Sequence, residues 1–305
     1  LTRLSKRTVE LENLPYGFSA MESIKSLSGW YIKSFQEFYK FNNLNNDREL
    51  LNILSNIYNR HADTSEKISD GLKQLNNDFS SRYDEDVFEF LKKNGHLPFG
   101  EFEKLNNAID QFYTNRFSVR LLIDQYINYD IKKENYIGVI NTETSPIKIL
   151  KEAVEDSSEV CKSNYGDSPE VNINSISDTT ICYIPSHLYY VLFELIKNSL
   201  RASIEKDMSP VEIVVSGEED IIIKISDKGK GIPYSDLNKI WYYSFTTKED
   251  NYYNSNITQN DIPMAGFGLG LPISRSIIKF LGGDIKIMSI ENYGTDVYIS
   301  LPKEK

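Results

Sequence analysis

Polar side chains recur between residues 187 and 201 at spacings that place them on one side of a helix. At roughly 100° per residue, four of these side chains point within about 40° of a common direction: His187, Glu194, Asn198 and Arg201. A carboxylate can accept a proton, an amide oxygen suits a hard cation, and a guanidinium suits phosphate. The remaining positions are apolar, so the helix is expected to line a site. By itself, the segment fits a partly exposed amphipathic helix equally well.

A second candidate follows the apolar run 221–226, which predicts a buried strand. The run ends at Asp227, and Gly229 and Gly231 come next. A carboxylate at a strand end can accept a hydrogen bond from an exocyclic amine, and the glycines would let a flat base lie against bare backbone. Alone, the pattern is more typical of a tight turn between strands.

Two further segments contain glycine at useful positions. Residues 266–271 alternate glycine with apolar residues before a predicted helix at 273–281: Gly266, Phe267, Gly268, Leu269, Gly270 and Leu271. Backbone amides and a positive helix end suit a triphosphate, and the glycines would let a flap hinge. Residues 294–301 predict an alternating strand with the hydroxyl of Thr295 near its start.

In this order, the four elements resemble the ATP-binding domain shared by gyrase-type ATPases, Hsp90 chaperones, bacterial histidine kinases and mitochondrial protein kinases. The resemblance implies ATP and Mg²⁺ as ligands. Asn198 would give its amide oxygen to Mg²⁺, and Glu194 would accept the proton of the incoming hydroxyl. Asp227 would hold the adenine amine, supported by Thr295. A P-loop is excluded, because no Gly-Lys-Ser/Thr is present.

Other residues have supporting roles. Lys197 and Arg201 would offset phosphate charge, although Lys197 could instead point to solvent. The glycines would let the nucleotide approach the backbone closely, and Ile232 would lie beside them. Thr246 and Thr247 match the entrance of the family's lid, where contact with phosphate and a structural role are equally open. The polar region 251–261 is interpreted as the lid itself, with an ordinary surface loop as the alternative.

The first half of the chain distinguishes the branches of that superfamily. None of His61, His96 and His187 has the neighbours of a histidine-kinase phosphoacceptor. Residues 30–35, 60–63 and 116–125 resemble the helical bundle of the mitochondrial 2-oxoacid dehydrogenase kinases, which comprise the pyruvate dehydrogenase kinases and the branched-chain enzyme. The resemblance spans nearly the whole chain. It implies a homodimer of the mitochondrial matrix that phosphorylates a serine of the E1 alpha subunit, binds the E2 lipoyl domain and could require K⁺.

The substrate complex stays open between pyruvate and branched-chain dehydrogenases. Tyr190 stands where pyruvate dehydrogenase kinases typically have histidine, which favours the branched-chain side, whereas residues 271–275 favour the pyruvate side. The chain ends four residues after Leu301, without the tail with which pyruvate dehydrogenase kinases usually grip the lipoyl domain. Binding to that domain is therefore in doubt.

A second site is expected among the helices. Arg116 and Arg120 are four residues apart, hence neighbours on one helix face. The matching family positions, with His61, border a pocket for small carboxylate effectors such as a 2-oxoacid, which two guanidiniums would suit. The alternative is a set of internal ion pairs with Asp63 or Asp124.

Composition sets broad limits. The net charge of −10 argues against nucleic acid as the main partner, and two cysteines form no disulfide framework. No apolar run reaches membrane-spanning length. Because the chain opens with Leu1, a targeting segment is expected to have been removed.

The predicted fold class is α plus α/β. Residues 1–135 would form a helical bundle, with apolar periodicity over 23–41, 48–57, 66–79 and 101–129, and residues 131–145 would contain the linker. Residues 146–305 would form an ATP-binding sandwich, a mixed sheet covered by helices on one face. Two alternatives remain within the superfamily: an ATP-switched ATPase in which Glu194 activates water, and a histidine kinase.

Overall fold

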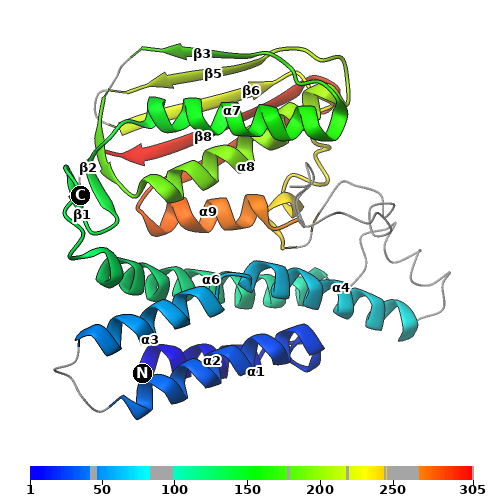
Figure 1. The fold of residues 1–305 in the computed structure, drawn as a ribbon. Helices are drawn as coiled ribbons and strands as arrows, with labels where there is room; N and C mark the ends of the chain where they lie inside the picture. Colours follow the sequence, from blue (N-terminus) through cyan, green and yellow to red (C-terminus); the bar gives the residue numbers. More distant parts are fainter. Residues whose placement is uncertain are drawn as a thin grey trace. The chain divides into compact units, whose positions relative to one another are not determined.

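The computed structural model describes residues 1–41, 47–82, 99–176, 179–217, 220–243, 245 and 268–303. Contacts within the chain divide it into two compact units, Leu1–Ile131 and Lys132–Lys305. Figure 1 shows helices alone in the first unit, and a sheet with helices in the second.

The first unit is a bundle of amphipathic helices, as predicted. Its helices are α1 (Thr2–Glu12), α2 (Glu22–Lys40), α3 (Asp47–Arg60), α4 (Thr64–Arg82) and α6 (Phe99–Asn128). Aromatic residues fill the core, where Phe18, Tyr31, Phe112 and Tyr113 are almost fully buried. The apolar periodicity of the sequence located these helices correctly because a bundle buries one face of each helix.

A glycine brings two of these helices close together. A Cβ atom on Gly71 of α4 would lie 2.8 Å from the side chain of Ile24 in α2 and 2.9 Å from Phe18. Such a separation is far below van der Waals contact, so no larger residue fits without displacing its neighbours. Gly71 thereby fixes how closely α4 packs against α2.

The second unit is built on a five-stranded mixed sheet, also as predicted. Its strands are β3 (Val171–Ser175), β5 (Val211–Ser216), β6 (Asp220–Asp227), β8 (Gly294–Pro302) and β7 (Asp284–Ile290), in this spatial order. Only the β3–β5 pair is parallel; the others are antiparallel. Three helices cover one face of this sheet (Figure 1): α7 (Pro146–Tyr165), α8 (Pro185–Ile204) and α9 (Gly270–Phe280).

The predicted linker needs correction. Residues 131–145 contain β1 (Tyr136–Ile137) and β2 (Ile140–Thr144), which form a small sheet with β4 (Ile181–Tyr183). The pairing is long-range, with Thr144 opposite Ile181. A short segment with little apolar content gives no periodicity of its own, so this sheet could not be read from the sequence.

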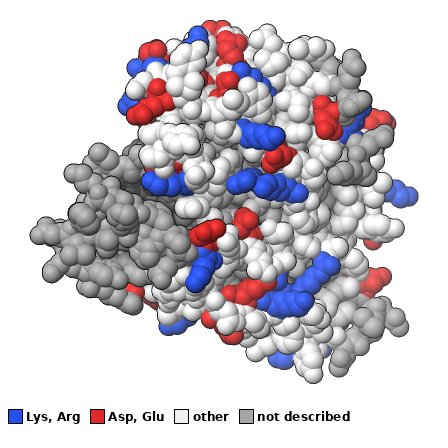
Figure 2. Space-filling model, turned by 180° about the vertical axis from the view of Figure 1, so that it is seen from behind, with Lys and Arg blue, Asp and Glu red and all other residues white. Residues whose placement is uncertain are grey.

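The sheet presents one apolar face to the helices. Burial alternates along β5 and β6: Ile213 in β5 and Ile223 in β6 are buried, whereas their immediate neighbours in each strand are half-exposed. On the opposite face, the described residues include no covering helix. Figure 2 views that side of the unit and shows acidic and basic side chains interspersed with uncharged ones. Across the described part of the chain, no helix has the length and apolar character needed to span a membrane.

Candidate active site

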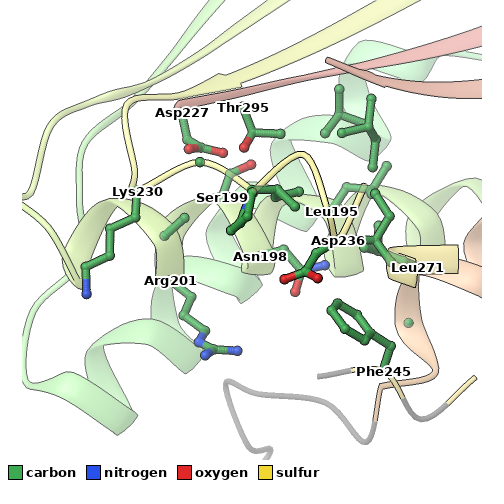
Figure 3. A pocket seen from close by; sticks show the side chains of 18 of the residues that line it. Leu195, Asn198, Ser199, Arg201, Asp227, Lys230, Asp236, Phe245, Leu271 and Thr295 are labelled. Atoms are coloured by element: carbon green, nitrogen blue, oxygen red, sulfur yellow. The ribbon is translucent and has the colours of Figure 1, made fainter. Parts of the chain in front are cut away.

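A cavity of about 700 Å³ lies between α8, the strand ends and the start of α9. Predicted site residues from four elements line it (Figure 3). Helix α8 contributes Glu194, Asn198 and Arg201. The remaining predicted residues on its wall are Asp227, Gly231, Ile232, Gly268, Gly270, Leu271 and Thr295.

Some predicted residues lie elsewhere. Lys197, Gly229 and Leu269 are described but do not line the cavity. Thr246, Thr247, Gly266 and Phe267 lie outside the described residues, as does the predicted lid at 251–261.

Lys197 is buried, contrary to the expectation that it could point to solvent. Only 3% of the residue is exposed, and its Nζ donates to Glu194 Oε1 at 2.7 Å. Both side chains are largely withdrawn from water, so their attraction is stronger than that of a surface pair. Lys197 therefore stabilises the charge of the carboxylate from behind the cavity wall.

The second oxygen of the same carboxylate faces α9. A Cβ atom on Gly270, the first residue of that helix, would lie 2.3 Å from Glu194 Oε2. The amino end of a helix carries partial positive charge, which favours a carboxylate at that point. Glycine at this position leaves room for the observed orientation of the Glu194 side chain, which a larger residue would displace.

Asn198 and Arg201 continue the polar side of α8 into the cavity. Within the described part of the chain, no hydrogen bond engages the Asn198 carboxamide, so its oxygen can serve a ligand. Arg201 donates from Nε to Glu205 Oε1 at 2.7 Å, which neutralises part of its charge. The other guanidinium nitrogens keep their capacity to bind phosphate oxygens.

Asp227 is a buried acceptor at the end of β6. Burial raises the pKa of its carboxyl group to about 6, while hydrogen bonds from the Gly229 and Thr295 backbone and the Ser199 side chain oppose the shift. The Gly229 N–H donates to Oδ1 at 2.9 Å. At neutral pH the group is ionised, and it faces a cavity in which an amine could donate to it.

A hydroxyl network lies beside Asp227. The Thr295 and Ser289 hydroxyls are 2.8 Å apart, and the Ser289 Oγ also donates to the Gly294 carbonyl and accepts from the Ile232 N–H at 2.8 Å. Thr295 stands opposite Asp227 in the β6–β8 ladder. The network thus fixes the Thr295 hydroxyl and the Ile232 backbone on the same wall.

The turn glycines allow close packing within the protein, and the predicted contact of their backbone with a base stays a prediction. A Cβ atom on Gly229 would lie 2.6 Å from the Cβ of Ala202 in α8. Gly231 has a φ of +67°, and its Cβ would be 2.1 Å from the Ile290 carbonyl oxygen. These glycines let the turn sit directly between α8 and the β7–β8 connection.

Comparisons with known proteins agree with this geometry. Residues 1–141 match the model of the mitochondrial branched-chain alpha-ketoacid dehydrogenase kinase, and residues 183–305 match that of the histidine kinase-, DNA gyrase B- and HSP90-like ATPase. A mitochondrial pyruvate dehydrogenase kinase of Arabidopsis thaliana is 31% identical over 99% of this chain and 81% of its own length. One from Schizosaccharomyces pombe is 30% identical over 98% of this chain and 85% of the relative.

The chain belongs to the mitochondrial 2-oxoacid dehydrogenase kinase family. It is a kinase of this type, with an ATP-binding domain in its second half. Isozyme 3 of mouse pyruvate dehydrogenase kinase, also mitochondrial, is 31% identical over 98% of the chain and 73% of its own length. The mitochondrial relatives support a mitochondrial location.

Sequence reasoning missed several residues of this candidate site. Ser199 and Asp236 line the cavity, and Figure 3 shows Asp236 and Phe245 there. Ser289 contacts the wall through Thr295 and Ile232. Ser199 neighbours Asn198 in the sequence, which offered a weak signal. Ser289 acts through a strand pairing with the Thr295 segment that spacing alone does not reveal.

The predicted effector residues of this kinase come together in the helical unit. The Arg116 Nη2 donates to the His61 carbonyl at 2.7 Å, and the Arg120 guanidinium lies 3.7 Å from the Tyr58 ring centre. The His61 Nε2 is 3.0 Å from Ser34 Oγ. Among the described residues, neither arginine forms the expected alternative ion pair with Asp63 or Asp124.

The positive charge of this cluster comes from its arginines. Burial, together with the positive charge of the nearby arginines, lowers the pKa of His61 to about 4, while a hydrogen bond with the Trp30 backbone opposes the shift. The imidazole is therefore neutral at pH 7, and positive charge comes from the guanidiniums alone. Arg116 is only 8% exposed, and its Nε has no partner among the described residues.

Proposed function

We propose that this kinase transfers the γ-phosphate of ATP to a serine of the E1 alpha subunit of a 2-oxoacid dehydrogenase complex in the mitochondrial matrix. The observation that carries the proposal is the presence of Glu194, Asn198 and Asp227 on the wall of one cavity. These groups are a proton acceptor, a hard-cation ligand and a buried acceptor for an amine.

The adenine end of the proposed site is at Asp227. Its carboxylate is ionised at neutral pH and would accept from the exocyclic amine of adenine. Guanine offers a carbonyl at the matching position, which a carboxylate would repel. The Thr295 hydroxyl would support this contact, and its hydrogen bond with the Ser289 hydroxyl would fix its position.

The phosphate end is at Asn198 and Arg201. The carboxamide oxygen of Asn198 fits Mg²⁺, with phosphate oxygens and water supplying further ligands. When bound, the ion would neutralise phosphate charge and orient the transferred group. The glycine-flanked start of α9 would offer backbone amides to the same phosphates. The K⁺ requirement that the family resemblance implies belongs to the proposal as an expectation.

Glu194 would act as the base. The serine oxygen attacks the γ-phosphorus as its proton passes to the Glu194 carboxylate, and the bond from phosphorus to the bridging oxygen breaks to release ADP. Lys197 binds one oxygen of this carboxylate, and the start of α9 lies close to the other.

Partners follow from the same proposal. The sheet face opposite the helices contains exposed apolar residues of β7, namely Met288 at 65% and Ile290 at 66% exposure. A homodimer through the nucleotide-binding unit would cover them. The E2 lipoyl domain remains a proposed partner by family resemblance, as does a small 2-oxoacid effector at Arg116 and Arg120.

A phosphorylation assay with purified E1 proteins tests the proposed function. Incubation with labelled ATP and either pyruvate or branched-chain E1 should give acid-stable label on an E1 alpha serine, and the better acceptor names the complex. Phosphate release without label on E1 would instead support the ATPase alternative, in which Glu194 activates water. Acid-labile label on the chain itself would indicate a histidine kinase.

A further inference from the structure

A lysine just past the end of α8 bridges two turns beside the cavity. The Lys206 Nζ donates to three backbone carbonyls: Lys228 at 2.9 Å, Gly229 at 3.2 Å and Asn292 at 3.1 Å. The first two belong to the turn after β6, and the third belongs to the connection between β7 and β8. An ammonium group has three protons to donate, and these carbonyls use all three.

The same two turns also contact each other through the backbone. The Asn292 N–H donates to the Lys230 carbonyl at 2.6 Å. Gly231 lies so close to the Ile290 carbonyl that no side chain fits between them. Both turns line the cavity, through Lys230 and Gly231 on one side and Asn292 on the other. A change in their separation would therefore reshape this end of the cavity.

One residue, Gly229, links Lys206 to the proposed adenine acceptor. The Gly229 N–H donates to Asp227 Oδ1, while the Gly229 carbonyl accepts from Lys206. The orientation of this residue is thus held at both its amide and its carbonyl. Releasing the carbonyl would loosen the hydrogen bond that fixes the Asp227 carboxylate.

We propose that Lys206 is a positioning residue for the base-binding end of the nucleotide site, acting through the two turns that it joins. The inference rests on the proposed function of Asp227 as the acceptor for adenine. Lys206 does not line the cavity, whereas Glu194 does, so Lys206 governs nucleotide affinity and not the transfer step.

The test compares variants of the full chain. Lys206→Met keeps the length and apolar stem of the side chain but removes the charge and the three donors. Lys206→Arg keeps a cation and donors. Lys151→Met removes the charge of an exposed lysine on α7 and serves as the matched control. ADP affinity is measured by calorimetry well below each thermal midpoint, and KM and kcat are measured for ATP.

Lys206→Met is expected to weaken ADP binding by roughly 5- to 20-fold, the scale of one or two lost charge-assisted hydrogen bonds. KM for ATP should rise in parallel, while kcat stays within about twofold of the wild type. Lys206→Arg should recover part of the affinity, and Lys151→Met should bind ADP like the wild type.

Two results would overturn the inference. One is ADP affinity of Lys206→Met within about twofold of the wild type. The other is an equal loss of kcat in Lys206→Met and Lys206→Arg without a change in KM, which would indicate a general effect on folding. If the wild-type chain itself fails to bind ADP, the proposed function fails. If the wild type binds ADP and Lys206→Met binds it equally well, only the role of Lys206 is removed.

Discussion

Lys197 and Gly270 lie on opposite sides of one carboxylate. The Lys197 Nζ is 2.7 Å from Glu194 Oε1, and the backbone of Gly270 adjoins Oε2 so closely that a Cβ atom would be 2.3 Å away. The first residue is on α8 and the second begins α9. The orientation of the proposed base therefore depends on two helices at once.

The first prediction concerns Gly270→Ala. The added methyl group should push the Glu194 side chain aside and lower kcat by roughly 10²-fold, because small misplacements of a catalytic group are costly. ATP affinity should change less. Gly29→Ala in α2 is the matched control, since a Cβ there meets nothing within 4 Å. Steady-state kinetics that show equal kcat for both variants would contradict the prediction.

The second prediction concerns Lys197→Met. Without its cation, the partly buried Glu194 carboxylate loses its main electrostatic support, and kcat should fall by roughly 10- to 100-fold while ADP affinity is largely kept. Glu194→Gln should fall further, since it removes the proton acceptor, and should still bind ATP. Single-turnover transfer to E1 measures both effects. Full activity of Lys197→Met would show that the ion pair is dispensable.

The third prediction concerns Asn198→Ala. Loss of the carboxamide oxygen should abolish the part of nucleotide affinity that depends on Mg²⁺. Titrations of ADP with Mg²⁺ and with EDTA should differ for the wild type and coincide for the variant. The control is Lys151→Met, because Lys151 is exposed, unlike the buried Leu200 beside the site. A retained Mg²⁺ effect would place the ion elsewhere.

The fourth prediction follows from the raised pKa of Asp227. Its folded value of about 6 exceeds the reference value of 3.8, so folding disfavours the ionised form. This group's contribution to stability is therefore present below pH 4 and is lost as pH rises through about 6. Asp227→Asn should stabilise the unliganded chain at pH 7.5 by up to about 3 kcal/mol, yet lose adenine binding.

Denaturant unfolding at two pH values checks this sign. The stability advantage of Asp227→Asn over the wild type should shrink between pH 7.5 and pH 5, where the native carboxyl group becomes protonated. In the same range, wild-type ADP affinity should weaken as the acceptor loses its charge. A stability advantage of Asp227→Asn that grows toward acid pH would be inconsistent with a buried Asp227 whose pKa is raised.

The fifth prediction concerns the effector cluster. Arg116→Ala should weaken inhibition by 2-oxoacid analogues while leaving basal transfer to E1 intact, since its guanidinium lies among the helices near His61. Because His61 is neutral above about pH 5, inhibition should not change between pH 6.5 and 8 through this imidazole. Arg48→Ala, on an exposed position of α3, is the control. Unchanged inhibition would remove the effector role.

The sequence determined much of this protein by itself. Helical periodicity located the bundle and α8, because a helix that packs on one face must repeat its apolar residues along that face. The spacing of Glu194, Asn198 and Arg201 placed three polar groups on one side of α8, and all three line the cavity. Such short-range geometry follows from the helix alone.

Only the tertiary structure decided the contacts between distant segments. Lys197 is one position from Asn198 and gave no sign of burial; its environment depends on what packs around α8. Gly270 meets Glu194, and Lys206 meets Asn292, across separations of more than 70 residues. Pairing between strands and packing between helices set these contacts, and no local pattern encodes a partner so far along the chain.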